Sequence, residues 1–205
     1  ETGATLGPLL IALVLLMKGN FRAGYAVLLV SAILALGSLT AARLSFPVPS
    51  DLETARTANA AHFTASYWLY MLAGSLFAAG LMSFEFISYH LSKSNIVTGY
   101  WIPLFLALST GLGVVASLVL GKLYDRIGMP TVIGAVVISS LFSPLVFLGG
   151  FSVALGGMLL WGVGYATQDT LLKAVLAGVL PEGRRNLGFG LFYTGYGAGW
   201  LIGSI

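Results

Sequence analysis

Three charged residues, Glu85, Asp169 and Lys173, lie within long apolar stretches of the sequence. Asp169 and Lys173 are four residues apart, so a helix would place them on one side, within reach of each other. A carboxylate held among apolar groups can carry a proton, and a neighbouring lysine can pair with it or contact a solute. The pair therefore predicts either proton and solute handling, or an ion pair whose lysine extends toward the polar membrane boundary.

A stripe of aromatic and polar side chains accompanies this pair. At 100° per residue, Trp161, Tyr165 and Gln168 fall with Asp169 and Lys173 within an arc of roughly 100°. Such a face should contact protein or water, whereas the rest of the helix is apolar. Two interpretations stay open, a packed ion pair near the end of the helix and a cavity wall that contacts a solute.

Glu85 is a second candidate proton carrier. It shares one predicted helical face with Tyr67 and Tyr89, and Tyr67 is a further candidate for a cavity wall. The alternative is that Glu85 lies among the outer headgroups, where it would be solvated or paired with Lys93. The sequence leaves both open.

The composition determines which elements position these residues. Of 205 residues, 58% are hydrophobic and only 8% are charged, whereas soluble domains carry about 25% charged residues. The chain is therefore predicted to be an all-α, polytopic transmembrane bundle in the lipid bilayer, because helices satisfy their own backbone groups. We expect no nucleic-acid partner, because no basic run is present. No metal or cofactor is predicted, since there are 0 cysteines and His62 and His90 lie at opposite ends of one segment.

About seven membrane helices are predicted from the apolar segments, which are 2–17, 24–44, 61–89, 99–120, 131–148, 151–179 and 187–205. The longest polar joint, 45–60, contains Pro47 and Pro49 and is predicted to be a linker between two bundles. It would separate a two-helix part, 1–44, from a five-helix part, 61–205. Because both ends of the sequence fall within apolar runs, we expect further helices in the same full-length chain.

The basic residues predict the orientation in the membrane. Alternate joints must lie on opposite sides, and the excess of Lys and Arg normally faces the cytoplasm. One side collects Arg43, Arg56, Lys122, Arg126, Lys173, Arg184 and Arg185, and the other collects Lys18, Arg22 and Lys93. The first side is therefore predicted to be cytoplasmic, in a multi-pass protein of the plasma (inner) membrane.

Small residues recur at every fourth position in two places. The lines are Gly113, Ser117 and Gly121, and Gly195, Gly199 and Gly203. In lipid, this spacing lets helix backbones approach closely. It is compatible with a fixed contact and with a sliding interface, and the spacing does not decide between them.

The strongest local pattern is Gly121-Lys122-Leu123-Tyr124-Asp125-Arg126-Ile127-Gly128. Its glycines permit a tight turn between helices. Asp125 could lie near the positive N-terminal end of a neighbouring helix, and Arg126 could pair with acids or headgroups. An ordinary charged turn that fixes the topology would have the same composition.

This pattern resembles the signature loop of the major facilitator superfamily. Because Met129 and Pro130 stand where that loop usually continues with basic residues, the match is to its second copy, between the eighth and ninth helices. The seven segments would then correspond to helices five to eleven of a partial major-facilitator fold. Gly7-Pro8 resembles the helix-bending motif of the fifth helix in antiporters, although Ile11 and Ala12 replace the glycine pair that follows it there.

The resemblance implies a function and several roles. It implies a secondary active transporter of a small organic solute that works by alternating access, and no enzyme. Gly121, Asp125, Arg126 and Gly128 would form the gating loop, and the segment with Asp169 would line the central cavity. Proton-coupled export is favoured, with uptake as the alternative; the partners would be a small-molecule substrate, protons and the missing helices.

Two other functions compete with transport. A membrane enzyme acting on a lipid-linked substrate would need clustered acids, and the chain has only 7 acidic residues. A non-transporting sensor or assembly subunit has no positive support in the sequence.

Overall fold

The computed structural model describes residues 2–18, 21–45, 62–97, 99–181 and 183–205. These residues form helices joined by short turns, without a strand among them. The elements are α1 (Thr2–Lys18), α2 (Phe21–Ser45), α3 (Ala65–Leu81), α4 (Phe84–Lys93), α5 (Trp101–Ile127), α6 (Met129–Ser140), α7 (Phe142–Leu148), α8 (Phe151–Ala166), the π-helix η2 (Thr167–Leu172), α9 (Lys173–Val179) and α10 (Arg185–Gly203). The predicted linker 45–60 lies, apart from Ser45, outside the described residues.

Within the described residues, four stretches are long and apolar enough to cross a membrane, namely Arg22–Ser45, Ala65–Lys93, Trp101–Ile127 and Met129–Leu148. Their outward surfaces are apolar, and Leu34 and Leu118, for example, are each 67% exposed. Such surfaces are stable against lipid and would be costly in water. The prediction of an all-α, multi-pass membrane bundle is confirmed.

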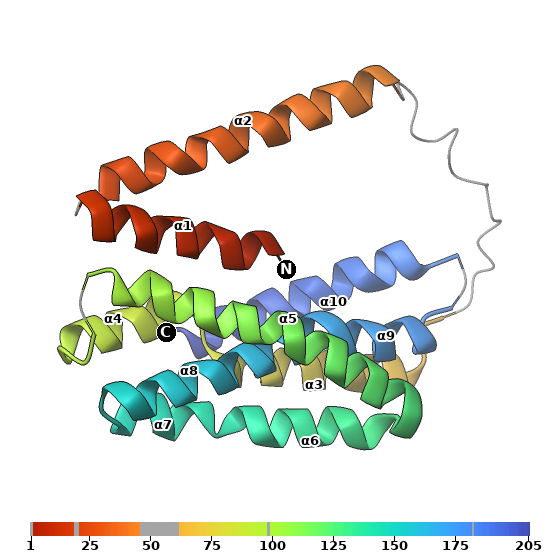
Figure 1. Cartoon of the computed structure of the whole chain (residues 1–205). Coiled ribbons are helices and arrows are strands. Elements are labelled where there is room, and N and C mark those ends of the chain that lie inside the picture. Colours follow the sequence, from red (N-terminus) through yellow and green to blue (C-terminus); the bar gives the residue numbers. More distant parts are fainter. Residues whose placement is uncertain (1, 19–20, 46–61, 98, 182) are drawn as a thin grey trace.

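The helices form a bundle in which α8 is central and α1 and α2 lie at one side (Figure 1). α8 packs against α5, α6 and α7, and α10 runs along α3. α1 packs along α5, whereas α2 contacts the bundle through α1. Successive helix ends alternate between two sides of the bundle, as the sequence predicts (Figure 1).

One buried hydrophobic cluster lies between α3, α4, α5, α7 and α8. Phe105, Phe142, Met158 and Trp161 are buried there, each at most 2% exposed. Glycines let α8 approach its neighbours, because a Cβ on Gly162 would lie 2.0 Å from the carbonyl oxygen of Ser109. This close approach fixes the depth at which the residues of α8 sit.

The segment 61–89, predicted to be continuous, is broken between α3 and α4. Met82 has φ of 58° and ψ of 162°, a conformation that a side chain disfavours. The Trp161 indole N–H donates to the carbonyl oxygens of Leu81, at 2.9 Å, and Met82, at 3.4 Å. The Ser83 N–H donates to Ser204 Oγ at 3.2 Å. Polar partners from α8 and from the end of α10 therefore satisfy backbone groups that the break leaves free.

The break also changes which residues share a face. Tyr67 is fully buried, whereas Glu85 and Tyr89 are exposed. The single helical face predicted for these three residues does not exist, because the helix phase is lost at Met82. Register arguments hold only within a continuous helix.

The signature pattern is helical for most of its length. α5 continues to Ile127, and the chain turns only at Gly128, whose φ is 69°. Gly121 lies inside the helix, so its predicted part in the turn is corrected. Gly128 takes the left-handed backbone conformation that glycine adopts without steric cost, as predicted.

Candidate functional site

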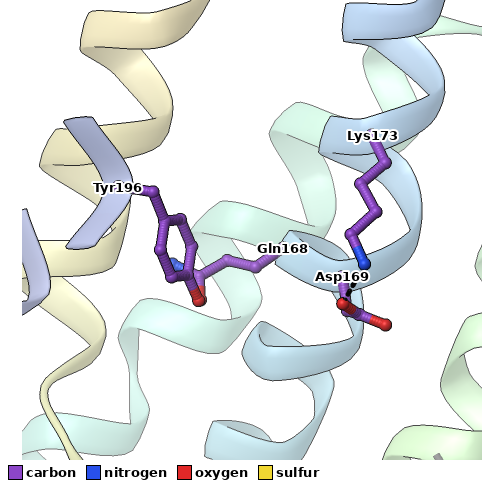
Figure 2. A network of polar contacts seen from close by, with 4 residues as sticks. All are labelled: Gln168, Asp169, Lys173 and Tyr196. Atoms are coloured by element: carbon purple, nitrogen blue, oxygen red, sulfur yellow. Dashed lines mark hydrogen bonds and ion pairs between the residues drawn. The ribbon is translucent and has the colours of Figure 1, made fainter. Parts of the chain in front are cut away.

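The polar site lies where the helix α8 changes to the π-helix η2. Lys173 and Asp169 form an ion pair within this segment, and their side chains are 36% and 41% exposed (Figure 2). The predicted pairing is therefore present. Lys173 Nζ also lies 5.8 Å from the centre of the Tyr193 ring of α10, a cation–π distance.

A second polar contact joins η2 to α10. The Tyr196 hydroxyl donates to Gln168 Oε1 at 2.7 Å, and Gln168 is only 3% exposed (Figure 2). Among the described residues, Gln168 Nε2 is buried and has no hydrogen-bond partner. Whichever way the amide is placed, one of its ends stays unpaired. A buried group of this kind costs free energy unless a ligand, water or moving element supplies the missing partner.

Tyr193 and Tyr196 were not predicted from the sequence. Their contacts reach across 20 and 28 positions, so no local spacing signals them. The available signal was weak, namely tyrosines three apart in a glycine-rich apolar helix.

Trp161 and Tyr165, the aromatic residues that precede this site in the chain, have different surroundings. Trp161 is 2% exposed and stacks on Tyr165 with ring centres 5.6 Å apart. Because its indole N–H binds the broken end of α3, Trp161 belongs to the core in this structure and not to an open wall. Tyr165 borders a cavity of about 10 Å³, barely the space that one water needs, with Ala4 of α1 and Thr110 of α5.

Tyr67 and Glu85 lie away from this site. The Tyr67 hydroxyl donates to the Gly188 carbonyl oxygen at 2.9 Å, so Tyr67 joins α3 to α10. Glu85 is exposed in the first turn of α4, where the helix N-terminus favours an acid. Lys93 Nζ lies 5.4 Å from the centre of the Tyr89 ring, and among the described residues no ion pair joins Lys93 to Glu85.

The predicted gating residues lie at the far end of α5. Asp125 and Arg126 are exposed, and within the described parts of the chain neither forms an ion pair. The expected partner of Asp125, the beginning of the fifth family helix at Glu1, lies outside the described residues. Gly7 and Pro8 lie inside α1, where proline removes a backbone donor and weakens the helix.

The structure thus gathers part of the predicted set. Gln168 is bound by Tyr196 of α10, whereas Asp169 pairs with Lys173, the first residue of α9 (Figure 2). Tyr165 lies one turn before Asp169. Across the described ranges, no cluster of His, Cys, Asp or Glu could hold a metal ion. The grouped residues offer hydrogen-bond groups, aromatic rings and one titratable pair, which suits the binding of an organic solute or a proton.

Comparisons with known proteins identify the family of this chain. Residues 1–204 match the family described as Major Facilitator Superfamily. The chain is 26% identical over 216 residues to uncharacterized proteins of Mycobacterium bovis and Mycobacterium tuberculosis, covering 99% of this chain and 53% of each relative. The chain therefore spans about half the length of the curated relatives it matches. No solved structure matches significantly.

The family match covers nearly the whole chain, and it accords with the apolar helices and with the loop pattern that ends at Gly128. The chain belongs to the Major Facilitator Superfamily of membrane transporters.

Proposed function

We propose that this chain is part of a secondary active transporter that moves a small organic solute by alternating access. The solute-contacting wall is the face of η2 and α10 that carries Gln168, Asp169 and Tyr196. The observation that carries the proposal is the buried Gln168 amide, which binds Tyr196 through one end and has no partner at the other. A second protein half that rocks against this wall gives alternating access to the same residues.

The energetic cost of the site supports a functional role. A charge in the membrane costs about 2.5–3.5 kcal/mol on insertion scales, and Asp169 and Lys173 both lie in a mainly apolar segment. The π-helical turn adds a further departure from regular structure, and such turns are frequent at functional sites. A purely structural helix would need neither feature.

Proton-coupled export is the specific mode that we propose, with Asp169 as the carrier. Asp169 binds Lys173 when ionised, and protonation would release Lys173 toward the solute or toward Tyr193. Gly7-Pro8, which resembles the motif of antiporters, supports export. The same proposal includes a gating role for Asp125 and a place in the inner plasma membrane. It also includes the division of the chain into 1–44, 45–60 and 61–205.

The test is solute-induced proton flux in the full-length protein, reconstituted in vesicles with trapped pyranine. A panel of small aromatic solutes is added on one side, and internal pH is recorded. We expect at least one solute to move protons, and Asp169→Asn to abolish the proton flux while solute still exchanges across the membrane. Undiminished coupling in Asp169→Asn would remove this residue from the carrier role.

The variant Glu85→Gln tests whether Glu85, and not Asp169, is the proton carrier. Loss of coupling in Glu85→Gln, with coupling retained in Asp169→Asn, would assign the carrier to Glu85. Asp125→Asn tests the gate separately, because a gating residue should change the transport rate more than the affinity for solute.

A further inference from the structure

The last two turns of α5 carry a groove that the transport site does not use. Val119, Lys122, Leu123 and Arg126 line it, and its volume is about 250 Å³. Their spacing of three and four places all of them on one face of the helix. All four side chains are exposed, with Val119 at 57% and Leu123 at 39%.

This face differs from the faces through which α5 contacts α1 and α8, its two main neighbours. Thr110 of α5 donates to the Ala4 carbonyl oxygen of α1, and Ser109 donates to the Met158 carbonyl oxygen of α8. Val119 follows Thr110 by nine residues, which is about 180° around a helix. The groove is therefore not part of the α1 or α8 contact.

The height of the groove matches the boundary between hydrocarbon and headgroups. At about 1.5 Å per residue, Val119 lies about 27 Å from Trp101 along α5, Lys122 about 32 Å and Arg126 about 38 Å. The hydrocarbon layer is about 30 Å thick. With Trp101, the first residue of α5, at the opposite boundary of this layer, Val119 lies at acyl-chain depth, while Lys122 and Arg126 reach the headgroups.

The two cations are unmatched within the described parts of the chain, where the only ion pair is Asp169–Lys173. Asp125 lies on the same turn as Lys122 and Arg126, yet it pairs with neither. Both cations lie on the side that collects most of the basic residues and is predicted to be cytoplasmic. The groove thus combines positive charge at its outer end with apolar surface below it.

We propose that this groove binds one anionic phospholipid, with its phosphate between Lys122 and Arg126 and an acyl chain along Val119 and Leu123. Cations at the inner face of a membrane attract anionic lipids, and arginine binds phosphate oxygens through two parallel donors. A soluble phosphate would bind the cations but would gain nothing from the apolar surface of Val119 and Leu123. A zwitterionic lipid has the acyl chains but no net charge.

The experiment is native mass spectrometry of the purified chain in detergent, titrated with dioleoyl phosphatidylglycerol or dioleoyl phosphatidylcholine. At roughly fivefold in affinity per cation, we expect the glycerol lipid to bind about 25-fold more tightly. Lys122→Gln with Arg126→Gln should reduce this preference to about twofold or less. The matched control is Arg184→Gln with Arg185→Gln, which removes the same charge at the beginning of α10 and should keep the preference.

Several results would overturn the proposal. An equal fall in the control variant would mean diffuse attraction to the whole basic side, and no preference in the unmodified chain would mean that another segment or partner covers the face. Displacement of the lipid by millimolar inorganic phosphate would mean that the cations alone bind. Circular dichroism of each variant should show unchanged helix content, since all four substituted side chains lie at the surface or at a helix end.

Discussion

Two helices, α10 and α5, carry small residues at every fourth position along one line, and the two lines have different surroundings. On α10, a Cβ at Gly199 would lie 2.1 Å from the Ser75 carbonyl oxygen, and one at Gly203 would lie 2.0 Å from that of Ala79. On α5, a Cβ at Gly113 would lie 3.0 Å from the Gly162 carbonyl oxygen, and one at Gly121 would meet nothing within 4 Å. One line is closed against a neighbouring backbone, whereas the other is closed at Gly113 and open at Gly121.

Four-residue spacing therefore identifies a line of small residues on a helix, but it does not identify the element that packs against that line. Along α10 the glycines let α3 approach to backbone contact, which favours a fixed interface, because sliding would drive carbonyl oxygens past the glycines. Along α5, no described residue lies within 4 Å of the Cβ position at Gly121.

The largest expected effect comes from adding a side chain to the glycine line of α10, which packs against α3. Gly199→Ala should lower the free energy of unfolding by about 3 kcal/mol, because its Cβ would force α10 away from the Ser75 backbone of α3. The measurement is unfolding of the purified chain by sodium dodecyl sulfate, followed by circular dichroism. Gly197→Ala is the matched control on the same helix, since nothing lies within 4 Å of its Cβ position. Equal stability of the two variants would contradict the backbone contact.

A hydrogen bond at the end of α3 provides the next test of how this helix is held. Trp161→Phe removes the indole donor from the carbonyl oxygens of Leu81 and Met82 and should cost about 1–3 kcal/mol. Hydrogen exchange should rise around Met82, because the break loses a partner that holds it. Trp68→Phe is the control, because Trp68 is 46% exposed and makes ring contacts with Phe63 and Tyr67. Unchanged exchange in Trp161→Phe would show that the break is held by other groups.

The closed position of the α5 line should respond less strongly. A Cβ at Gly113 would lie 3.0 Å from the Gly162 carbonyl oxygen, so α8 must shift by only a few tenths of an ångström. We expect Gly113→Ala to cost about 1 kcal/mol in the same unfolding assay, clearly less than Gly199→Ala. A loss as large as that of Gly199→Ala would erase the distinction between the two lines.

Local spacing predicted the parts of this molecule that depend on neighbours in sequence. The apolar segments, the alternation of their ends and the ion pair of Asp169 with Lys173 follow from helical geometry and the thickness of lipid. The turn at Gly128 follows from the freedom of glycine. Each of these involves residues at most one helix length apart.

The missed features depend on distant partners or on small irregularities. Tyr67 binds Gly188 across 121 positions, and Trp161 binds Leu81 across 80. No proline stands at the break near Met82, and no residue within Thr167–Leu172 distinguishes a π-turn from a regular helical turn. Periodicity therefore placed Tyr67 and Trp161 on helix faces but could not tell a packed core from an open wall.

The smallest effect is expected at the open end of the α5 line. Gly121 lies inside a regular helix, and nothing lies within 4 Å of its Cβ position. Gly121→Ala should therefore raise the free energy of unfolding by up to about 1 kcal/mol, because alanine favours the helix and restricts the unfolded chain. The same detergent unfolding assay measures this gain. If Gly121→Ala were instead destabilising in the full-length protein but stabilising in this chain, a segment outside the described residues would close the line, and the two glycine lines would become alike.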